Sequence, residues 1–89
     1  MTRPRSPVRE IRQRRDWRAA DLAALAGISI GAVTMVERGE LAKLPARLES
    51  ALIRLGEDVE QVRARQAEFV EARRRELEMQ ALQPSDSEQ

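Results

Sequence analysis

The sequence predicts a small all-α protein, because its apolar residues recur at helical spacing, its glycines follow those stripes, and its aromatic residues are few. Of its 89 residues 42% are hydrophobic, but only 2% are aromatic, so Leu, Ile, Val and Ala must build the core. Side chains of this size favour helices that pack closely together. The length leaves room for one small domain and one additional element.

The first two helices are expected after a flexible basic arm. Residues 1–7 contain two prolines and two arginines without periodicity, which is typical of an extended segment. A short helix should begin at Val8, because Val8 and Ile11 form an apolar edge among arginines. Asp16 is the expected N-cap of the second helix, and Gly27 is where that helix should end.

The third and fourth helices follow after short connections. Ser29 can cap a helix only two residues beyond Gly27, and Gly39 is expected to end it. The second and third helices would therefore meet at a very tight turn. Pro45 suits the first position of a fourth helix, which Gly56 would end.

A long fifth helix is expected at the carboxyl end. Asp58 and Gln61 form a capping box for a helix over residues 59–82, which would be roughly 36 Å long at 1.5 Å per residue. Residues 83–89 are polar and are expected to be disordered. Residues 8–58 would then form one domain, followed by the long helix and the tail.

Charge is distributed unevenly along the chain. Residues 1–18 hold seven arginines against two acidic residues, a net charge of +5, whereas the chain from residue 44 onward holds seven arginines against ten acidic residues, a net charge of −3. The chain has a basic front and a mildly acidic rear, although its total charge is only +1.

The composition argues against several functional classes. The chain has no Cys and no His, so it lacks the usual zinc ligands, thiol nucleophiles and the commonest general base. We therefore expect no enzyme, metal or cofactor. No apolar run approaches the roughly 20 residues of a membrane span, which predicts a cytoplasmic protein associated with the nucleoid.

Residues 19–38 carry the pattern that suggests a function. A helix-turn-helix needs a small residue where its second helix crosses the first, a Gly in the turn, and a β-branched residue facing the joint. Ala23, Gly27 and Val33 occupy these positions. An αα-corner inside another kind of helical protein is the alternative that these stripes also allow.

With these residues the chain resembles the Cro and phage-repressor class of helix-turn-helix proteins, the Xre family, over roughly residues 8–60. The resemblance implies a five-helix, lambda-repressor-like domain that binds double-stranded DNA. Several positions agree in register, which is more specific than a single Gly-rich pattern. The matching residues are Leu22, Ala23, Gly27, Ile28, Ser29, Val33, Val36, Glu37, Arg38, Gly39, Leu48, Leu52, Leu55 and Gly56.

The resemblance also implies which residues meet DNA. Thr34 can hydrogen-bond a base edge, and Ile30 or Met35 can pack on a thymine methyl, but the middle of the helix offers no Asn, Gln, Lys or Arg. Sequence readout is therefore expected to be weak, or to come from DNA shape and the arm. The implied groove-facing positions are Ser29, Ile30, Gly31, Thr34, Met35 and Arg38.

Basic residues outside that helix are expected to add affinity. Arg3 and Arg5 resemble a minor-groove arm, although a solvated basic tail explains them equally well. Arg14, Arg15 and Arg18 lie close to the motif and are expected to contact phosphates. Arg18 stands where typical members have a capping Ser or Thr, and its charge could replace the phosphate contact of the Gln that usually follows.

The fifth helix is expected to join two copies of the chain. Apolar residues continue along it at alternating spacings of three and four residues, which is typical of a seam between helices. The alternative is that Val59 and Val62 close the domain's own core and that pairs such as Glu71 and Arg75 support an exposed helix. The expected seam comprises Val62, Gln66, Phe69, Val70, Arg73 and Leu77.

The predicted function is a transcriptional regulator that binds a short, two-fold symmetric DNA site as a homodimer. The rival is an antitoxin-like or adaptor module that uses the helix-turn-helix as a scaffold and holds a protein partner with its last helix. The apolar recognition helix keeps this rival open. An enzyme ranks third, because no pairing of a nucleophile with a base is evident.

Overall fold

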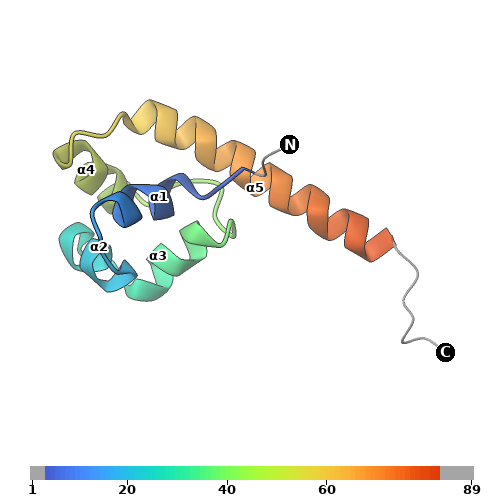
Figure 1. Cartoon of the computed structure of the whole chain (residues 1–89), viewed down its shortest axis with the longest axis horizontal. Helices are drawn as coiled ribbons and strands as arrows, with labels where there is room; N and C mark the ends of the chain where they lie inside the picture. The colour runs from blue at the N-terminus through green and yellow to red at the C-terminus, as the bar shows by residue number, and fades with distance from the viewer. Residues whose placement is uncertain (1–3, 83–89) are drawn as a thin grey trace.

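A computed structural model describes residues 4–82, and this part of the chain contains five helices and no strand. The helices are α1 (Pro7–Arg14), α2 (Ala19–Ala26), α3 (Ile30–Glu37), α4 (Ala46–Arg54) and α5 (Val59–Leu82) (Figure 1). The predicted all-α fold is confirmed. Arg3, the first part of the expected arm, and the expected tail at residues 83–89 lie outside the described residues.

The beginnings of α1 and α2 differ from the expectation. The Ser6 hydroxyl accepts a hydrogen bond from the Arg9 amide at 3.1 Å, so α1 starts at Pro7, one residue before Val8. Asp16 does not cap α2, because the chain turns there with a φ of 56°, a left-handed conformation that Asp tolerates better than most residues. Arg18 is the N-cap residue instead.

The remaining helix ends follow the local sequence closely. Gly27 has a φ of 71° in the turn after α2, and the Ser29 hydroxyl accepts from the Ala32 amide at 3.0 Å at the start of α3. Pro45 lies just before α4 instead of inside it. The Asp58 carboxylate accepts from the amides of Glu60 and Gln61 at 3.1 and 3.3 Å, and α5 spans the predicted residues.

The core lies where α1 to α4 meet the beginning of α5. Val33 is fully buried and Ala23 is 3% exposed, as expected for the crossing of α2 and α3. Burial of such aliphatic side chains contributes about 1.5–3 kcal/mol for each large residue, before conformational entropy is subtracted. The other buried apolar residues are Val8, Ile11, Leu22, Ala26, Val36, Leu44, Leu48, Ala51, Leu52 and Val62.

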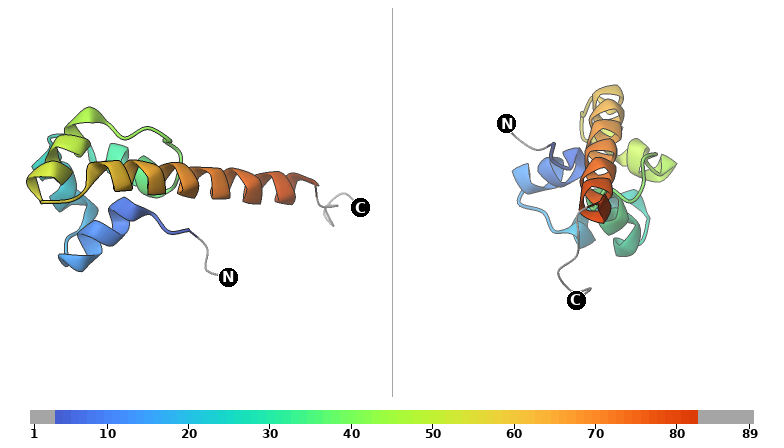
Figure 2. Two further views of the ribbon diagram at one scale, coloured as in Figure 1. Left: turned by 90° about the horizontal axis from the view of Figure 1, so that it is seen from above. Right: turned by 90° about the vertical axis from the view of Figure 1, so that its right-hand side faces the viewer.

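The last helix extends far beyond this core. Figure 2 shows α5 leaving the domain as a straight rod, and the molecule measures 52 × 23 × 23 Å along its principal axes. Along the projecting part Leu77, Met79 and Leu82 are 51%, 64% and 84% exposed. Within residues 4–82 no single helix could span a membrane, and only α2 and α3 together, bent by 116°, reach the required length and apolarity.

Candidate nucleic-acid interface

Helix α3 has one buried face and one open face. Its inner face consists of Val33, Val36 and Glu37, which are at most 4% exposed. On its outer face Ile30 and Met35 are 53% and 41% exposed, and Ser29, Gly31 and Arg38 are exposed as well. The implied groove-facing positions therefore lie on the solvent side of α3.

Thr34 is the least available of these positions. Its side chain is half-buried, and its hydroxyl donates a hydrogen bond to the Ile30 carbonyl at 3.0 Å, one turn earlier in the helix. The hydroxyl proton is therefore used within α3, and the oxygen keeps only its capacity to accept. The outer face of α3 consequently offers mainly apolar contact.

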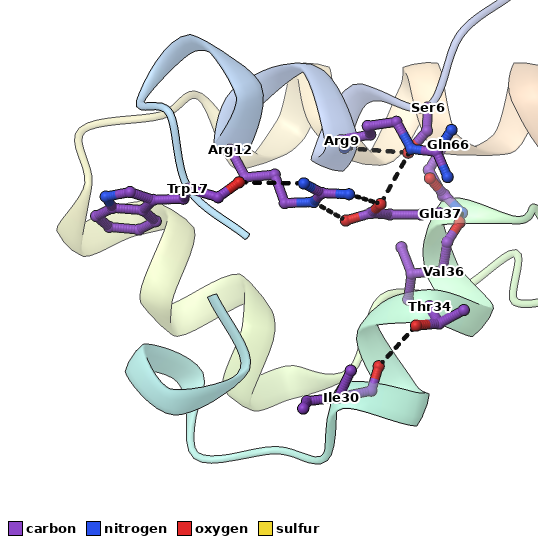
Figure 3. A network of polar contacts seen from close by, with 9 residues as sticks. All are labelled: Ser6, Arg9, Arg12, Trp17, Ile30, Thr34, Val36, Glu37 and Gln66. Atoms are coloured by element: carbon purple, nitrogen blue, oxygen red, sulfur yellow. Dashed lines mark hydrogen bonds and ion pairs between the residues drawn. The ribbon is translucent and has the colours of Figure 1, made fainter. Parts of the chain in front are cut away.

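Glu37, at the end of α3, is a buried carboxylate held by two arginines of α1 (Figure 3). Arg12 binds it through two nitrogens at 2.7 and 2.8 Å, and Arg9 donates at 3.1 Å. Arg12 also donates to the Trp17 carbonyl at 3.1 Å, so the same guanidinium fixes the chain between α1 and α2. The network attaches the carboxyl end of α3 firmly to α1.

The titration of Glu37 reflects this arrangement. Burial by itself would raise the pKa of Glu37, but the hydrogen bonds from Arg12 and Arg9 and their positive charges outweigh it and lower the pKa. This role of Glu37 was not predicted from the sequence. A signal was present, because Glu37 follows Val33 by four residues and so lies on the buried face, where a charge needs a partner.

Two of the expected phosphate contacts have partners within the domain. Arg15 is fixed by the Ile11 carbonyl at 3.1 Å, the Leu55 carbonyl at 3.2 Å and Glu57 at 3.1 Å. The guanidinium of Arg15 thus joins α1 to the turn before α5, and its contact with a phosphate stays a prediction. Arg14 is largely exposed and approaches the same Glu57 at 3.4 Å.

Of the other basic residues expected to contact DNA, Arg18 lies at the start of α2 and Arg5 lies near the end of α3. Arg18 is exposed at the beginning of α2, and its backbone amide donates to the Asp21 carboxylate at 2.8 Å. Arg5 lines a hollow with Glu37 and Phe69, at the end of α3 where α5 passes. Its contact with the minor groove stays a prediction, as does that of Arg3.

Two arginines of α4 bind backbone carbonyls at the end of α2, a role that was not predicted from the sequence. Arg47 donates to the Gly27 carbonyl at 3.1 Å, and Arg54 donates to the Leu25 carbonyl at 3.0 Å. Both guanidinium groups provide hydrogen-bond donors to carbonyls at the end of α2, where the helix dipole favours positive charge. Their spacing of seven residues places them on one side of α4, which was the available signal.

The expected seam on α5 divides into two parts. Val62 is 5% exposed and Gln66 is fully buried inside the domain, so neither can face a second chain in this conformation. Here the seam is corrected, and the alternative that Val62 closes the core is right. Phe69 was expected beyond the core, but its ring packs closely against Gly39, as Arg73 does. A Cβ at Gly39 would lie only 3.2 Å from the Phe69 ring and 3.0 Å from Arg73 Cδ.

The outer seam residues remain candidates for assembly. Val70 is half-buried and Leu77 is 51% exposed, and their part in assembly stays a prediction. Among residues 4–82 no group of three or more Asp, Glu, His or Cys residues is placed to hold a metal ion.

Comparison with known families agrees with this geometry. The model of a helix-turn-helix family matches residues 8–61, which is more than half of the chain. No curated protein and no solved structure matches the chain. The matched residues include α1 to α4, the tight turn at Gly27 and the open face of α3, and on this evidence the chain belongs to the Cro/C1-type, Xre-like helix-turn-helix family of DNA-binding proteins.

Proposed function

We propose that the protein is a transcriptional regulator that binds a two-fold symmetric DNA site as a homodimer. The observation that carries this proposal is the open outer face of α3 in a chain of a DNA-binding family. Ile30 and Met35 keep 53% and 41% of their surface exposed, so both apolar side chains are available to a ligand.

The proposed contacts follow from the chemistry of this face. Ile30 and Met35 pack on thymine methyl groups, and the Thr34 oxygen accepts from a base edge. Ser29 and Gly31 let the start of α3 approach the DNA backbone closely. The exposed cations Arg18, Arg38 and Lys43 would meet phosphates, whereas Arg47 is held by the Gly27 carbonyl at 3.1 Å.

The dimer is proposed from the projecting part of α5. Leu77 is half exposed, and Val70 lies two turns earlier on the same side of the helix. A second copy of this helix would cover both side chains, and the two-fold axis of such a pair would match a symmetric site. Occupancy of that site would regulate the neighbouring promoter.

Salt titration tests the proposal. A duplex selected from genomic fragments and a scrambled duplex of the same length are each titrated with protein at several salt concentrations. For five to eight phosphate contacts the logarithm of the binding constant should fall with the logarithm of salt with a slope of about −5 to −7. Absence of binding at low salt, or no preference for the selected duplex, would contradict the proposal and favour a protein-interaction module.

A further inference from the structure

Gln66 is a polar side chain enclosed completely within the domain. It is 0% exposed, and its amide nitrogen donates to the Val36 carbonyl at 3.0 Å and to the Leu41 carbonyl at 2.9 Å. Its amide oxygen has no hydrogen-bond partner among the described residues. Burying the amide oxygen without a partner costs free energy, and an apolar side chain would fill the same space without that cost. The two donated hydrogen bonds therefore indicate a further role for Gln66.

The two carbonyls belong to the end of α3 and to the chain that leaves it. Val36 lies in the last turn of α3, where its carbonyl also accepts from the Gly39 amide at 3.1 Å, and Leu41 lies in the connection to α4. No Cα atom of α3 lies within 8 Å of a Cα atom of α5. The long side chain of Gln66 therefore spans a gap that the two helix backbones do not close (Figure 3).

The next turn of α5 rests on the same connection. Gly39 has a φ of 78°, and a Cβ at this position would lie 3.0 Å from Arg73 Cδ and 3.2 Å from the ring of Phe69. Both the hydrogen bonds of Gln66 and this close packing thus hold the segment after α3 against α5. On the other side, Arg9 and Arg12 of α1 hold Glu37.

We infer that Gln66 is a positioning residue that sets the orientation of α3 relative to α5. The inference rests on the proposed function, because in a dimer joined through α5 this orientation determines how the two α3 helices are spaced on DNA. A change in the orientation would misplace both outer faces relative to a symmetric site. Preference for that site would fall, whereas contact with phosphates of any sequence would persist.

The test compares Gln66→Met with Gln61→Met. Met has a similar length and cannot donate to the carbonyls, and Gln61 is exposed on the same helix, so its variant controls for the change of residue type. The measured quantity is the ratio of affinities for a selected and a scrambled duplex. Gln66→Met should lower this ratio about three- to tenfold, as one or two lost hydrogen bonds would, with dimer mass unchanged.

Amide hydrogen exchange provides a readout that does not depend on DNA. In Gln66→Met the amides of residues 37–41 should exchange at least about fivefold faster, while those of α2 keep their rates. If Gln66→Met does not fold, Gln66→Asn takes its place, because its shorter side chain keeps the amide but cannot reach both carbonyls.

The outcomes separate this inference from the proposed function. An unchanged affinity ratio in a folded variant overturns the positioning role, and so does faster exchange spread evenly over all helices. If the unaltered protein binds no DNA, the proposed function fails. In that case, faster amide exchange confined to residues 37–41 of Gln66→Met still supports the link between α3 and α5.

Discussion

The two halves of α5 have the same secondary structure but different support. In residues 59–69, Val62 and Gln66 are buried, and ion pairs reach other helices: Arg63 binds Glu49 of α4 at 2.6 and 2.9 Å, and Arg65 binds Glu10 of α1. In residues 70–82 the ion pairs of Arg74 with Glu71 and Glu78, and of Arg75 with Glu71, stay on α5 itself.

This difference indicates what each half needs in order to stay helical. Tertiary packing supports the first half, whereas the second half touches the domain mainly where Arg73 lies against Gly39. A helix of about a dozen residues with little tertiary packing is marginal in water. The second half therefore depends on continuity with the first half and, in our proposal, on a second copy of the chain. Substitutions in the two regions should consequently have very different effects.

The largest contrast is expected between Val33→Asp and Leu77→Asp. Val33 is fully buried, so a carboxylate introduced at this position would have no partner. The substitution should lower the unfolding free energy by several kcal/mol, enough to unfold so small a domain. Leu77 is 51% exposed, so the same change there should leave the domain folded. Thermal melting of both variants measures the contrast. Equal melting temperatures would mean that Val33 is not at the crossing of α2 and α3.

Disruption of the proposed dimer is expected to have the next largest effect. Val70→Glu combined with Leu77→Glu puts like charges into the proposed contact, so the protein should sediment as a monomer with its domain intact. Affinity for a full symmetric site should fall by about two orders of magnitude or more, because one chain reaches only one half-site.

A matched control for the dimer variant is Glu68→Ala with Gln80→Ala, which changes two exposed residues of the same helix. Persistence of the dimer in the Glu variant would place the contact elsewhere. A monomer that keeps full affinity for the site would show that assembly does not serve DNA binding.

Acid should weaken the domain through Glu37. The pKa of Glu37 is lowered in the folded protein from an ordinary value of 4.5, so its stabilisation is present above that value and is lost as the pH falls through the lowered pKa. Glu37→Gln should cost about 1.5–3 kcal/mol at pH 7, as expected for hydrogen bonds to a charged group.

Urea unfolding at pH 7 and pH 3 provides the measurement for Glu37. The difference in unfolding free energy between the two pH values should be smaller in Glu37→Gln than in the unaltered protein. An identical difference in both proteins would assign the acid sensitivity to other carboxylates.

The smallest effect is expected for Arg74→Ala in the outer half of α5. Its ion pairs with Glu71 and Glu78 are exposed and lie within one helix, so their loss should leave the unfolding free energy of the domain almost unchanged. Fraying of residues 70–82 should increase without a change in the melting of the domain. A drop of several degrees in the melting temperature would show that this half contributes to the core.

The sequence allowed much of the fold to be predicted, because helical periodicity and local capping determine helix ends. Ser29, Gly27 and Asp58 act on residues at most five positions away, so their roles could be read from the chain directly. The prediction that Asp16 caps α2 was wrong, because Asp also tolerates the left-handed turn that the chain makes there.

The interactions that were missed or misassigned join residues distant in sequence. Arg12 and Glu37 are 25 residues apart, Gln66 and Val36 are 30 apart, and Arg15 and Glu57 are 42 apart. One sequence shows that Arg15 is basic but not that Glu57 lies beside it. The groove-facing positions on α3 were implied by the family resemblance; five of the six are exposed and Thr34 is half-buried, and their contacts with DNA stay predictions.

The end of α3 is held from two sides, by α1 through Glu37 and by α5 through Gln66. The helix is therefore ordered before it meets any ligand, and binding through its outer face should cost little additional conformational entropy. The heat capacity change on binding should then reflect the surface buried in the complex, without a contribution from coupled folding of α3.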